Sequence, residues 1–424
     1  MNIAASLILW MVYIISLYFS IFLFLVYLDK RSSFRATETP RETSYEPFIS
    51  ILVPAYNEEK TILKTLRSIY ALDYSQEKME VIVINDGSKD ATLQVISQFG
   101  FDKPNMIIIN QENKGKAAAL NSALKIARGE LFACLDADSF VHPFTLQKML
   151  HIYATEKDER LAIVTPAMKV YEPKNMLQKV QWLEYLVIIL IARLSSEMDS
   201  LYVAPGPFSL YKTAVIRRIG GFDEQNITED QEIAYRIQQH HYRIKQCPDG
   251  YVYTSSPETL KGFYRQRRRW YLGGMICASK YKSMVGNKEY GDFGIMQMVK
   301  NVLGYGFAIV GIGLGLYLLL KPLVHYLNTL FLVHFDIWPY ISNLKWKITF
   351  FTFMMIDFRK GFLVLFLMMI GYFLFWASLR NSREKAYGYG WIPLFPYFAY
   401  YYTLKAFILL VCVIKFARRK NVKW

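Results

Sequence analysis

Long apolar runs lie at both ends of this 424-residue chain and enclose a polar stretch that reaches from Asp29 to about Lys300. The first run, Leu7–Leu28, contains no charged residue and exceeds the roughly 20 residues that a helix needs to cross a bilayer. It has neither the basic start nor the small-residue cleavage site of a signal peptide, so we interpret it as a retained span. The chain is therefore expected to combine membrane helices with a soluble domain.

Further apolar segments follow the polar stretch. Val302–Leu320 and Gly361–Leu379 are uncharged, whereas Pro393–Ile414 carries Lys405. Pro322–Ile341 contains two histidines and an aspartate, and three interpretations stay open: it spans the membrane, re-enters it or lies flat. We favour five spans in all, which places the C-terminus inside. Lys405 is expected either to face a polar conduit or to snorkel to the interface.

Basic residues indicate the orientation. Lys30, Arg31 and Arg35 directly follow the first span, and such residues stay on the cytoplasmic side. The N-terminus is therefore expected outside and the polar stretch in the cytoplasm. Much of the net charge of +15 lies near the membrane segments, where it serves orientation and attraction to anionic lipid rather than nucleic-acid binding. The four cysteines have neither paired nor metal-ligand spacing, so free thiols and no zinc site are expected.

Short apolar runs alternate with helical patterns across the polar stretch. The predicted strands are Ile49–Val53, Glu80–Ile84, Met106–Ile109 and Leu131–Leu135. The predicted helices cover Thr61–Tyr70, a segment after the turn Asn85-Asp86-Gly87-Ser88, and Ala117–Arg128. This alternation predicts an α/β fold of parallel strands with helices on both faces.

Polar residues follow these strands at the edge where open parallel sheets bind ligands. Asn57 and Glu58 follow the first strand, Asp86 follows the second, and Asp136 and Asp138 follow the fourth. We therefore expect these side chains to face one crevice.

Asp136-Ala137-Asp138 has two interpretations. Two carboxylates two residues apart can face one side of an extended segment, and Mg²⁺ or Mn²⁺ is commonly held by one or two carboxylates together with substrate phosphates. Such an ion would neutralise charge on a departing diphosphate. A solvated turn that caps the next helix is the alternative. The apolar preceding strand and the register with Asp86 favour the metal site.

Two neighbouring segments also have one functional and one structural interpretation each. Asp86 can hydrogen-bond a nucleoside, or it can cap the helix that follows the Asp-Gly turn. Lys116, in Lys114-Gly115-Lys116, opens a predicted helix, where a lysine suits an anionic ligand. The alternative is an ordinary exposed lysine that binds no ligand.

Two later motifs also combine structural and chemical interpretations. Thr228 with Gln231 predicts a capping box, which would also hold Asp230 rigidly as a base for an attacking hydroxyl. The run Gln266-Arg267-Arg268-Arg269-Trp270 can be a basic juxtamembrane face. That interpretation explains the arginines but not Gln266 and Trp270, which suit phosphate and sugar binding beside an arginine.

Together these motifs resemble family 2 glycosyltransferases. The segments that carry the resemblance are Pro54-Ala55-Tyr56-Asn57-Glu58, Asn85-Asp86-Gly87-Ser88, Gly115-Lys116-Ala117, Asp136/Asp138, Thr228-Glu229-Asp230 and Gln266-x-x-Arg269-Trp270. They are similar to the membrane-embedded processive synthases of cellulose, hyaluronan, chitin and poly-N-acetylglucosamine. Thr-Glu-Asp and Pro257-Glu258-Thr259-Leu260 look most like bacterial poly-β-1,6-N-acetylglucosamine synthases. The resemblance implies a glycosyltransferase A fold with a Rossmann-like mixed sheet.

The resemblance also implies a role for each matched residue. Asp230 would be the general base, and Asp138 would hold Mg²⁺ or Mn²⁺. The residues that would bind the donor are Tyr56, Glu58, Asp86, Lys116, Asp136 and Asp138. The residues that would shape the acceptor and diphosphate site are Glu229, Gln266, Arg269 and Trp270. Ala204–Phe208 matches the acceptor-side loop of the family only loosely and receives no role.

The implied activity is inverting, metal-dependent polymerisation of a UDP-sugar, expected to be UDP-N-acetylglucosamine, into an extracellular polysaccharide that the protein helps to export. The alternatives are single transfer to a lipid acceptor, processive synthesis with another sugar, and an inert membrane scaffold, which would show decayed acidic motifs. Expected partners are the UDP-sugar, the growing glycan, the bilayer and a small membrane accessory subunit, but no nucleic acid.

The expected organisation is a membrane helix over 1–30 and a linker over 31–47. A cytoplasmic catalytic domain follows over 48–275, with interfacial helices towards its C-terminal end. Residues 276–424 form a membrane region with three or four spans and a basic tail. The protein is expected in the cell membrane.

Overall fold

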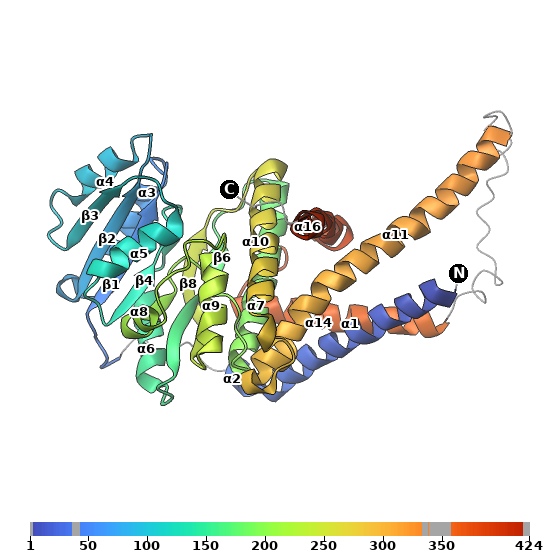
Figure 1. The fold of residues 1–424 in the computed structure, drawn as a ribbon, viewed down its shortest axis with the longest axis horizontal. Helices are drawn as coiled ribbons and strands as arrows, with labels where there is room; N and C mark the ends of the chain where they lie inside the picture. The colour runs from blue at the N-terminus through green and yellow to red at the C-terminus, as the bar shows by residue number, and fades with distance from the viewer. Residues whose placement is uncertain (1–2, 36–42, 333–337, 339–357, 419–424) are drawn as a thin grey trace.

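The structure, a computed structural model, describes residues 3–35, 43–332, 338 and 358–418. A sheet flanked by helices lies at one end of the molecule, and long apolar helices extend away from it at the other end (Figure 1). Two helices, α7 (Met176–Glu197) and α10 (Leu260–Lys280), lie between these two parts.

Within the described residues, the strands form one eight-stranded sheet in the order β3-β2-β1-β4-β7-β6-β8-β5. The strands are β1 Ile49–Ala55, β2 Met79–Asp86, β3 Met106–Gln111, β4 Leu131–Cys134, β5 Ser139–Val141, β6 Leu161–Val170, β7 Leu210–Lys212 and β8 Arg243–Thr254. The first four pair in parallel, which confirms the prediction for this half of the sheet. β7 is antiparallel to β4 and β6, so the complete sheet is mixed.

β1 continues through Pro54, where the sequence analysis ends this strand. The carbonyl of Leu52 accepts a hydrogen bond from Leu135, so alternate residues of β1 direct their polar groups towards β4. Pairing with β4 stops at Leu52, whereas pairing with β2 extends to Ala55. Pro54 is tolerated because its missing N–H would point to the side where the ladder has already ended.

The sheet has an apolar core on each face, as the predicted α/β pattern requires. Alternate residues of β1 divide between the cores: Ile49, Ile51 and Val53 enter one, and Leu52 enters the other. The first core is covered by α3 (Ile62–Tyr70), α4 (Thr92–Gly100) and α6 (Thr145–Thr155). The second is covered by α5 (Lys116–Ile126), α8 (Thr213–Arg218) and α9 (Glu229–Gln239).

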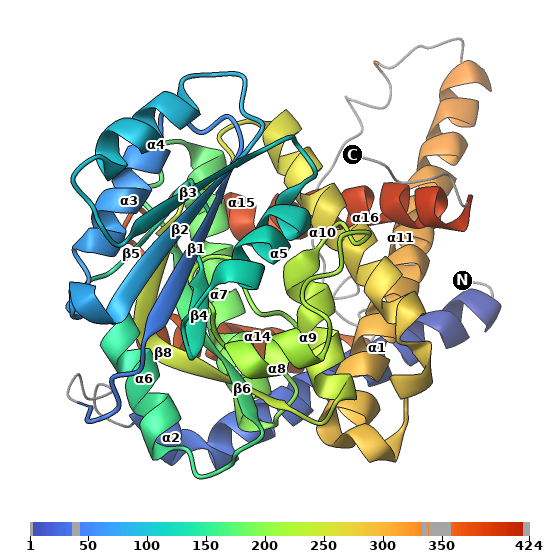
Figure 2. The same ribbon diagram turned by 60° about the vertical axis from the view of Figure 1, so that its left-hand side comes forward.

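A third core joins the sheet domain to the apolar helices. It contains Trp182 of α7 and Phe263 of α10 together with Phe375 and Ile408 from the C-terminal helices. Figure 2 shows α10 beside α9 on one side and close to α16 (Tyr402–Ala417) on the other. α10 therefore connects the carboxyl-terminal helices to the soluble domain.

Among the described residues, four helical segments are long and apolar enough to cross a membrane: Ser6–Asp29, Phe293–Gly311, Gly361–Ser382 and Leu394–Ala417. The helical elements that contain them are α1 Ile3–Asp29, η4 Phe293–Met298, α11 Val299–Leu332, α14 Phe358–Ser382, α15 Leu394–Pro396, η5 Tyr397–Tyr401 and α16. Each segment overlaps one of the four spans that the sequence analysis predicts outside Pro322–Ile341.

α11 differs from the predicted layout because it runs through Pro322 without interruption. The predicted segments Val302–Leu320 and Pro322–Ile341 were expected to be separate, but the structure joins Val302 to Leu332 in one helix. Prolines are tolerated in apolar helices of this kind because neighbouring groups satisfy the freed carbonyls. Beyond Leu332 only Trp338 of the predicted segment is described, so the five-span layout stays a prediction.

Candidate active site

The turns after β1 and β2 bind each other at the carboxyl edge of the sheet. Asn57 adopts a left-handed conformation with φ of 56°, and its N–H donates to the Ser88 hydroxyl over 3.0 Å. The next N–H, that of Glu58, donates to Thr92 Oγ1 at the start of α4 over 2.8 Å. Tyr56 is 45% exposed beside this turn. Tyr56 and Glu58 therefore lie at the predicted edge.

Asp86 is the last residue of β2 and is buried. Its carboxylate accepts hydrogen bonds from the Gln111 side chain over 2.8 Å and from the N–H groups of Lys114 and Gly115 over 3.0 and 2.8 Å. It therefore holds the loop that enters α5, and it does not cap α4, which begins without a side-chain cap. The capping interpretation is wrong, because none of these three donors belongs to α4.

Lys116 connects the sheet edge to a second element. Its ammonium lies 2.5 Å from Asp136 Oδ1 and 2.7 Å from Glu229 Oε1 at the start of α9. Burial lowers the pKa of this lysine, but the two carboxylates outweigh burial and raise it above its usual value. Lys116 is thus a partly buried, permanently charged link, and the alternative of a merely exposed lysine is wrong.

Asp138 lies among other carboxylates. Burial, followed by the charges of Asp136 and Glu58, raises its pKa to about 6. Ser139 Oγ donates to Asp138 Oδ1 over 3.0 Å. Burial also raises the pKa of Glu58, although a hydrogen bond from Thr61 opposes this effect. The three carboxylates therefore create a negative potential that a cation would relieve.

The chemistry of Asp138 fits Mg²⁺ or Mn²⁺. These ions take oxygen ligands, and Mg²⁺ is usually bound by one or two carboxylates plus substrate phosphates rather than by an all-protein cage. In the part of the chain that the structure describes, no group of three His, Cys, Asp or Glu side chains converges to form such a cage. Because Lys116 already pairs with Asp136, Asp138 is the carboxylate best suited to the ion.

Glu229 and Asp230 lie at the start of α9, and their pKa values shift in opposite directions. Burial alone would raise the pKa of Glu229, but Lys116 outweighs burial and lowers it. Burial and the adjacent negative charge of Glu229 raise the pKa of Asp230 to about 6. Asp230 Oδ1 accepts a hydrogen bond from the Gln231 N–H over 2.8 Å. Asp230 is therefore a carboxylate that can take up a proton near neutral pH.

The predicted capping box at Thr228 is not formed. Thr228 makes no side-chain cap to α9, and its hydroxyl lies 3.3 Å from Asn226 Oδ1 instead. The N–H of Gln231 is occupied by Asp230 Oδ1.

The loop Ala204–Phe208, which received no role from the sequence, lies against the charged link. A Cβ at Gly206 would lie 2.7 Å from Lys116 Nζ and 3.1 Å from Asp136 Oδ2, so only glycine fits here without displacing the lysine. Gly206, Lys116, Glu229 and Asp230 together line a narrow recess. The sequence signal for this loop is a glycine between two prolines.

α10 brings the Gln-x-x-Arg-Trp residues to the same region. Gln266 Oε1 is buried and has no hydrogen-bond partner among the described residues. Arg269 is close enough that its charge favours the ionised forms of Glu229 and Asp230. The Trp270 ring centre lies 4.1 Å from the Arg267 guanidinium carbon.

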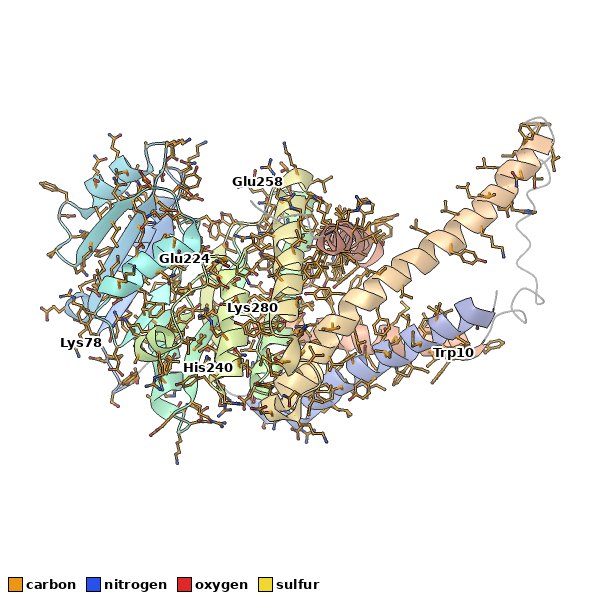
Figure 3. All side chains as sticks on the ribbon, in the orientation of Figure 1. Trp10, Lys78, Glu224, His240, Glu258 and Lys280 are labelled. Atoms are coloured by element: carbon orange, nitrogen blue, oxygen red, sulfur yellow. The ribbon has the colours of Figure 1, made fainter. Side chains whose placement is uncertain are left out.

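Two contacts lock α10 to α9. Gly273 allows the helix to approach Thr228 closely, where a side chain would overlap the threonine hydroxyl. At the far end, the fully buried Glu232 accepts hydrogen bonds from Lys280 Nζ over 2.7 Å and from Tyr281 OH over 2.6 Å. Figure 3 labels Lys280 on α10. The Gly273-Gly274 pair inside a helical pattern is the sequence signal for this approach.

A mixed sheet with carboxylates at the ends of its parallel strands and an acidic helix start facing them is the arrangement of a glycosyltransferase A fold. Residues 50–220 match the family model described as "Glycosyl transferase family 2", so this part of the chain is a family 2 glycosyltransferase domain. The predicted resemblance is confirmed.

Two curated relatives extend this comparison. The chain is 35% identical over 227 residues to poly-beta-1,6-N-acetyl-D-glucosamine synthase of Staphylococcus aureus (strain COL), covering 53% of this chain and 54% of that protein. It is 34% identical over 227 residues to the synthase of the same name from Staphylococcus epidermidis, with the same coverage. The chain thus spans about half the length of the curated relatives it matches.

Among solved structures, the chain resembles the mannosyltransferase PcManGT from Pyrobaculum calidifontis in complex with GDP-Man and Mn²⁺. The TM-score is 0.52 at 21% sequence identity, and the match covers 72% of this chain and 91% of that chain. At this identity the likeness shows the fold alone.

Proposed function

We propose that this chain is an inverting, metal-dependent and processive glycosyltransferase that polymerises UDP-N-acetylglucosamine into an extracellular polysaccharide and helps to export it. The family 2 domain supports the reaction class. The synthases that are 35% identical to this chain over 227 residues support the choice of sugar.

The observation that carries this proposal is the double ion pair of Lys116. One ammonium contacts Asp136 at the end of β4 and Glu229 at the start of α9. Asp230 is therefore held beside the strand-end carboxylates rather than on a separate surface. A donor bound at the sheet edge would present its anomeric carbon to the same recess.

The chemistry requires one base. The acceptor hydroxyl oxygen forms a bond to the anomeric carbon while the bond from that carbon to the diphosphate breaks, and UDP leaves with the electron pair. The hydroxyl proton passes to the Asp230 carboxylate. Attack from the face opposite the diphosphate inverts the configuration. A base with a pKa of about 6 is mostly ionised at neutral pH, yet close enough to the operating pH to accept the proton.

The negative charge on the departing diphosphate has to be stabilised by positive charge. Mg²⁺ or Mn²⁺, held by Asp138, would supply most of this charge. Arg269 lies near Glu229 and Asp230, and its guanidinium suits bidentate phosphate contacts. Gln266, whose Oε1 is buried without a partner among the described residues, and Trp270 are proposed to hold the acceptor.

A membrane location supports the polymerase proposal. α10 carries the proposed acceptor residues and shares an apolar core with α14 and α16, two of the helices long enough to span a bilayer. The growing glycan would thus be released next to membrane helices. Such an exit avoids exposing a polar polymer to hydrocarbon. The basic residues after the first span support a cytoplasmic catalytic domain.

A sizing assay on membranes that contain the protein tests this function. Radiolabelled UDP-N-acetylglucosamine and UDP-glucose are supplied separately with Mg²⁺, Mn²⁺ or EDTA, and the labelled product is sized. We expect high-molecular-weight label from UDP-N-acetylglucosamine that disappears with EDTA. Label confined to the lipid extract would favour single transfer to a lipid acceptor. Transfer from UDP-glucose alone would refute the choice of sugar, and transfer from neither donor would refute the polymerase.

A further inference from the structure

A buried charged network joins three helices behind the proposed acceptor residues. Glu184 of α7 accepts hydrogen bonds from Arg267 of α10 and from both Tyr401 and Lys405 in the C-terminal helices. The Glu184 and Arg267 side chains are only 5% and 1% exposed. Lys405 is thus an ion-pair partner of Glu184, a role that neither alternative from the sequence, a conduit or the interface, included.

The network contains more polar groups than a purely stabilising contact needs. Arg267 donates to Glu184 and, over 3.2 Å, to Tyr401 OH, but its Nε and Nη1 atoms are buried without a hydrogen-bond partner among the described residues. Two cations face one carboxylate. Replacing buried ion pairs by apolar side chains is often neutral or stabilising, so stability alone is a poor reason for this arrangement.

The position of the Arg267 guanidinium offers a better reason. Its central carbon lies 4.1 Å from the centre of the Trp270 ring and 5.0 Å from the Phe263 ring. A planar guanidinium stacks on an aromatic face, so Arg267 restricts how the Trp270 ring can turn. Glu184 in turn restricts Arg267.

We propose that Glu184 and Arg267 are positioning residues that clamp α10 to α16 and hold the Trp270 ring in the orientation that retains the growing glycan. Neither residue contacts the reacting atoms in this account. The inference rests on the proposed function, because it assigns to this network the control of product length. A chain end that is held in place receives the next sugar before it dissociates.

The main test uses Arg267→Lys, which keeps a cation for Glu184 but removes the planar group that stacks on Trp270. We expect the mean product length to fall by about tenfold, because small misplacements of bound groups have effects of this size. The KM for UDP-N-acetylglucosamine should stay unchanged, since Arg267 is not a donor ligand. In a Trp270→Phe background, Arg267→Lys should shorten the product little further, because both changes act through the same ring.

Glu184→Gln is the second variant, and Glu80→Gln is its matched control. Glu80 is another buried carboxylate paired with an arginine, Arg128, but it lies at the start of β2, away from α10. Glu184→Gln should shorten the product and expose Cys412 to a maleimide, because Cys412 is buried with its Sγ 3.9 Å from the Arg268 carbonyl. Glu80→Gln should do neither.

Unchanged product length in Arg267→Lys would overturn the proposal. So would equal shortening in Glu80→Gln, or full additivity of Arg267→Lys with Trp270→Phe. If Glu184→Gln fails to accumulate, the product length of Arg267→Lys alone supports or refutes the proposal. If the wild type makes no polymer, the proposed function fails. Maleimide labelling of Cys412, which needs no sugar, then tests the clamp: faster labelling in Glu184→Gln than in Glu80→Gln supports it, and equal labelling refutes it.

Discussion

Asp230 and its neighbour Glu229 show how one lysine gives adjacent carboxyl groups different roles. Lys116 contacts Glu229 over 2.7 Å and keeps it ionised. The resulting negative charge, added to burial, raises the pKa of Asp230. Environments that separate the pKa values of neighbouring carboxyl groups are typical of catalytic sites. Asp230 is therefore suited to take up a proton, whereas Glu229 is suited to hold the lysine.

The pH dependence of turnover follows from this difference. Asp230 works as a base only when it is ionised, and its pKa is about 6. The kcat/KM for the donor, measured at low donor concentration so that it reports the free protein, should therefore fall as the pH falls through about 6 and should be restored above it. The measurement is initial UDP release from membranes across this range. A rate that stays level through pH 6 would contradict the assignment.

Gly206→Ala tests the charged link without removing any charge. The new Cβ would lie 2.7 Å from Lys116 Nζ, and the flexible end of the lysine can move away. We expect little change in stability but a fall in turnover of about tenfold, because the lysine no longer aligns Asp136 and Glu229. UDP release and thermal unfolding in detergent measure both effects. Gly304→Ala is the control, since a Cβ there meets no other atom within 4 Å.

At the scale of the elements, α10 approaches its neighbours closely at two glycines, Gly273 and Gly274. Gly273 packs against Thr228 directly before the Glu229–Asp230 pair. Gly273→Ala should therefore separate α10 from α9 and destabilise the protein by about 1–3 kcal/mol, as expected for an overpacked contact. Turnover should fall with it, because Arg269 and Trp270 move with α10.

Thermal unfolding and UDP release test this prediction. Gly304→Ala again serves as the control for an alanine placed in a helix. If Gly273→Ala melts and turns over like the wild type, then α10 does not need this contact and the proposed coupling of the two motifs is wrong.

The strands and helices that could be predicted from the sequence are those with a clear local pattern of apolar residues. The four parallel strands and the helices between them were predictable because their apolar periodicity serves cores on both faces. The other four strands, β5 to β8, were missed. β5 and β7 are only three residues long, and prolines interrupt the apolar patterns of β6 and β8. The capping box at Thr228 was predicted from local spacing and is wrong, since the Gln231 N–H donates to Asp230 Oδ1 and the Thr228 hydroxyl contacts Asn226 instead.

The site residues show the same division. Strand-end positions such as Asp86 and Asp136 follow from the strand pattern, whereas the role of Gly206 depends on a loop that folds back onto Lys116. Lys405 was predicted to face a conduit or to snorkel to the interface, because charged residues within a membrane usually avoid lipid. Its partner, Glu184, lies 221 residues earlier in the chain, beyond the reach of any local pattern.

At the scale of the whole molecule, the proposal requires the sheet domain to face the cytoplasm. Phe101 offers a reporter because it is 94% exposed between α4 and β3, and all four natural cysteines are buried. In Phe101→Cys, a membrane-impermeant maleimide should label the protein only after the cells are permeabilised. The wild type should remain unlabelled in both conditions. Labelling of Phe101→Cys in intact cells would reverse the proposed orientation.

The central claim is that Asp230 is the base for polymer synthesis, and the most direct measurement compares the wild type with Asp230→Asn. Membranes containing each protein receive radiolabelled UDP-N-acetylglucosamine with Mg²⁺ or Mn²⁺, and the label is sized. The asparagine keeps the shape of the side chain but cannot take up the proton, so high-molecular-weight label should fall by about 100-fold or more while the protein stays folded. Polymer synthesis at the wild-type rate by Asp230→Asn would contradict the account.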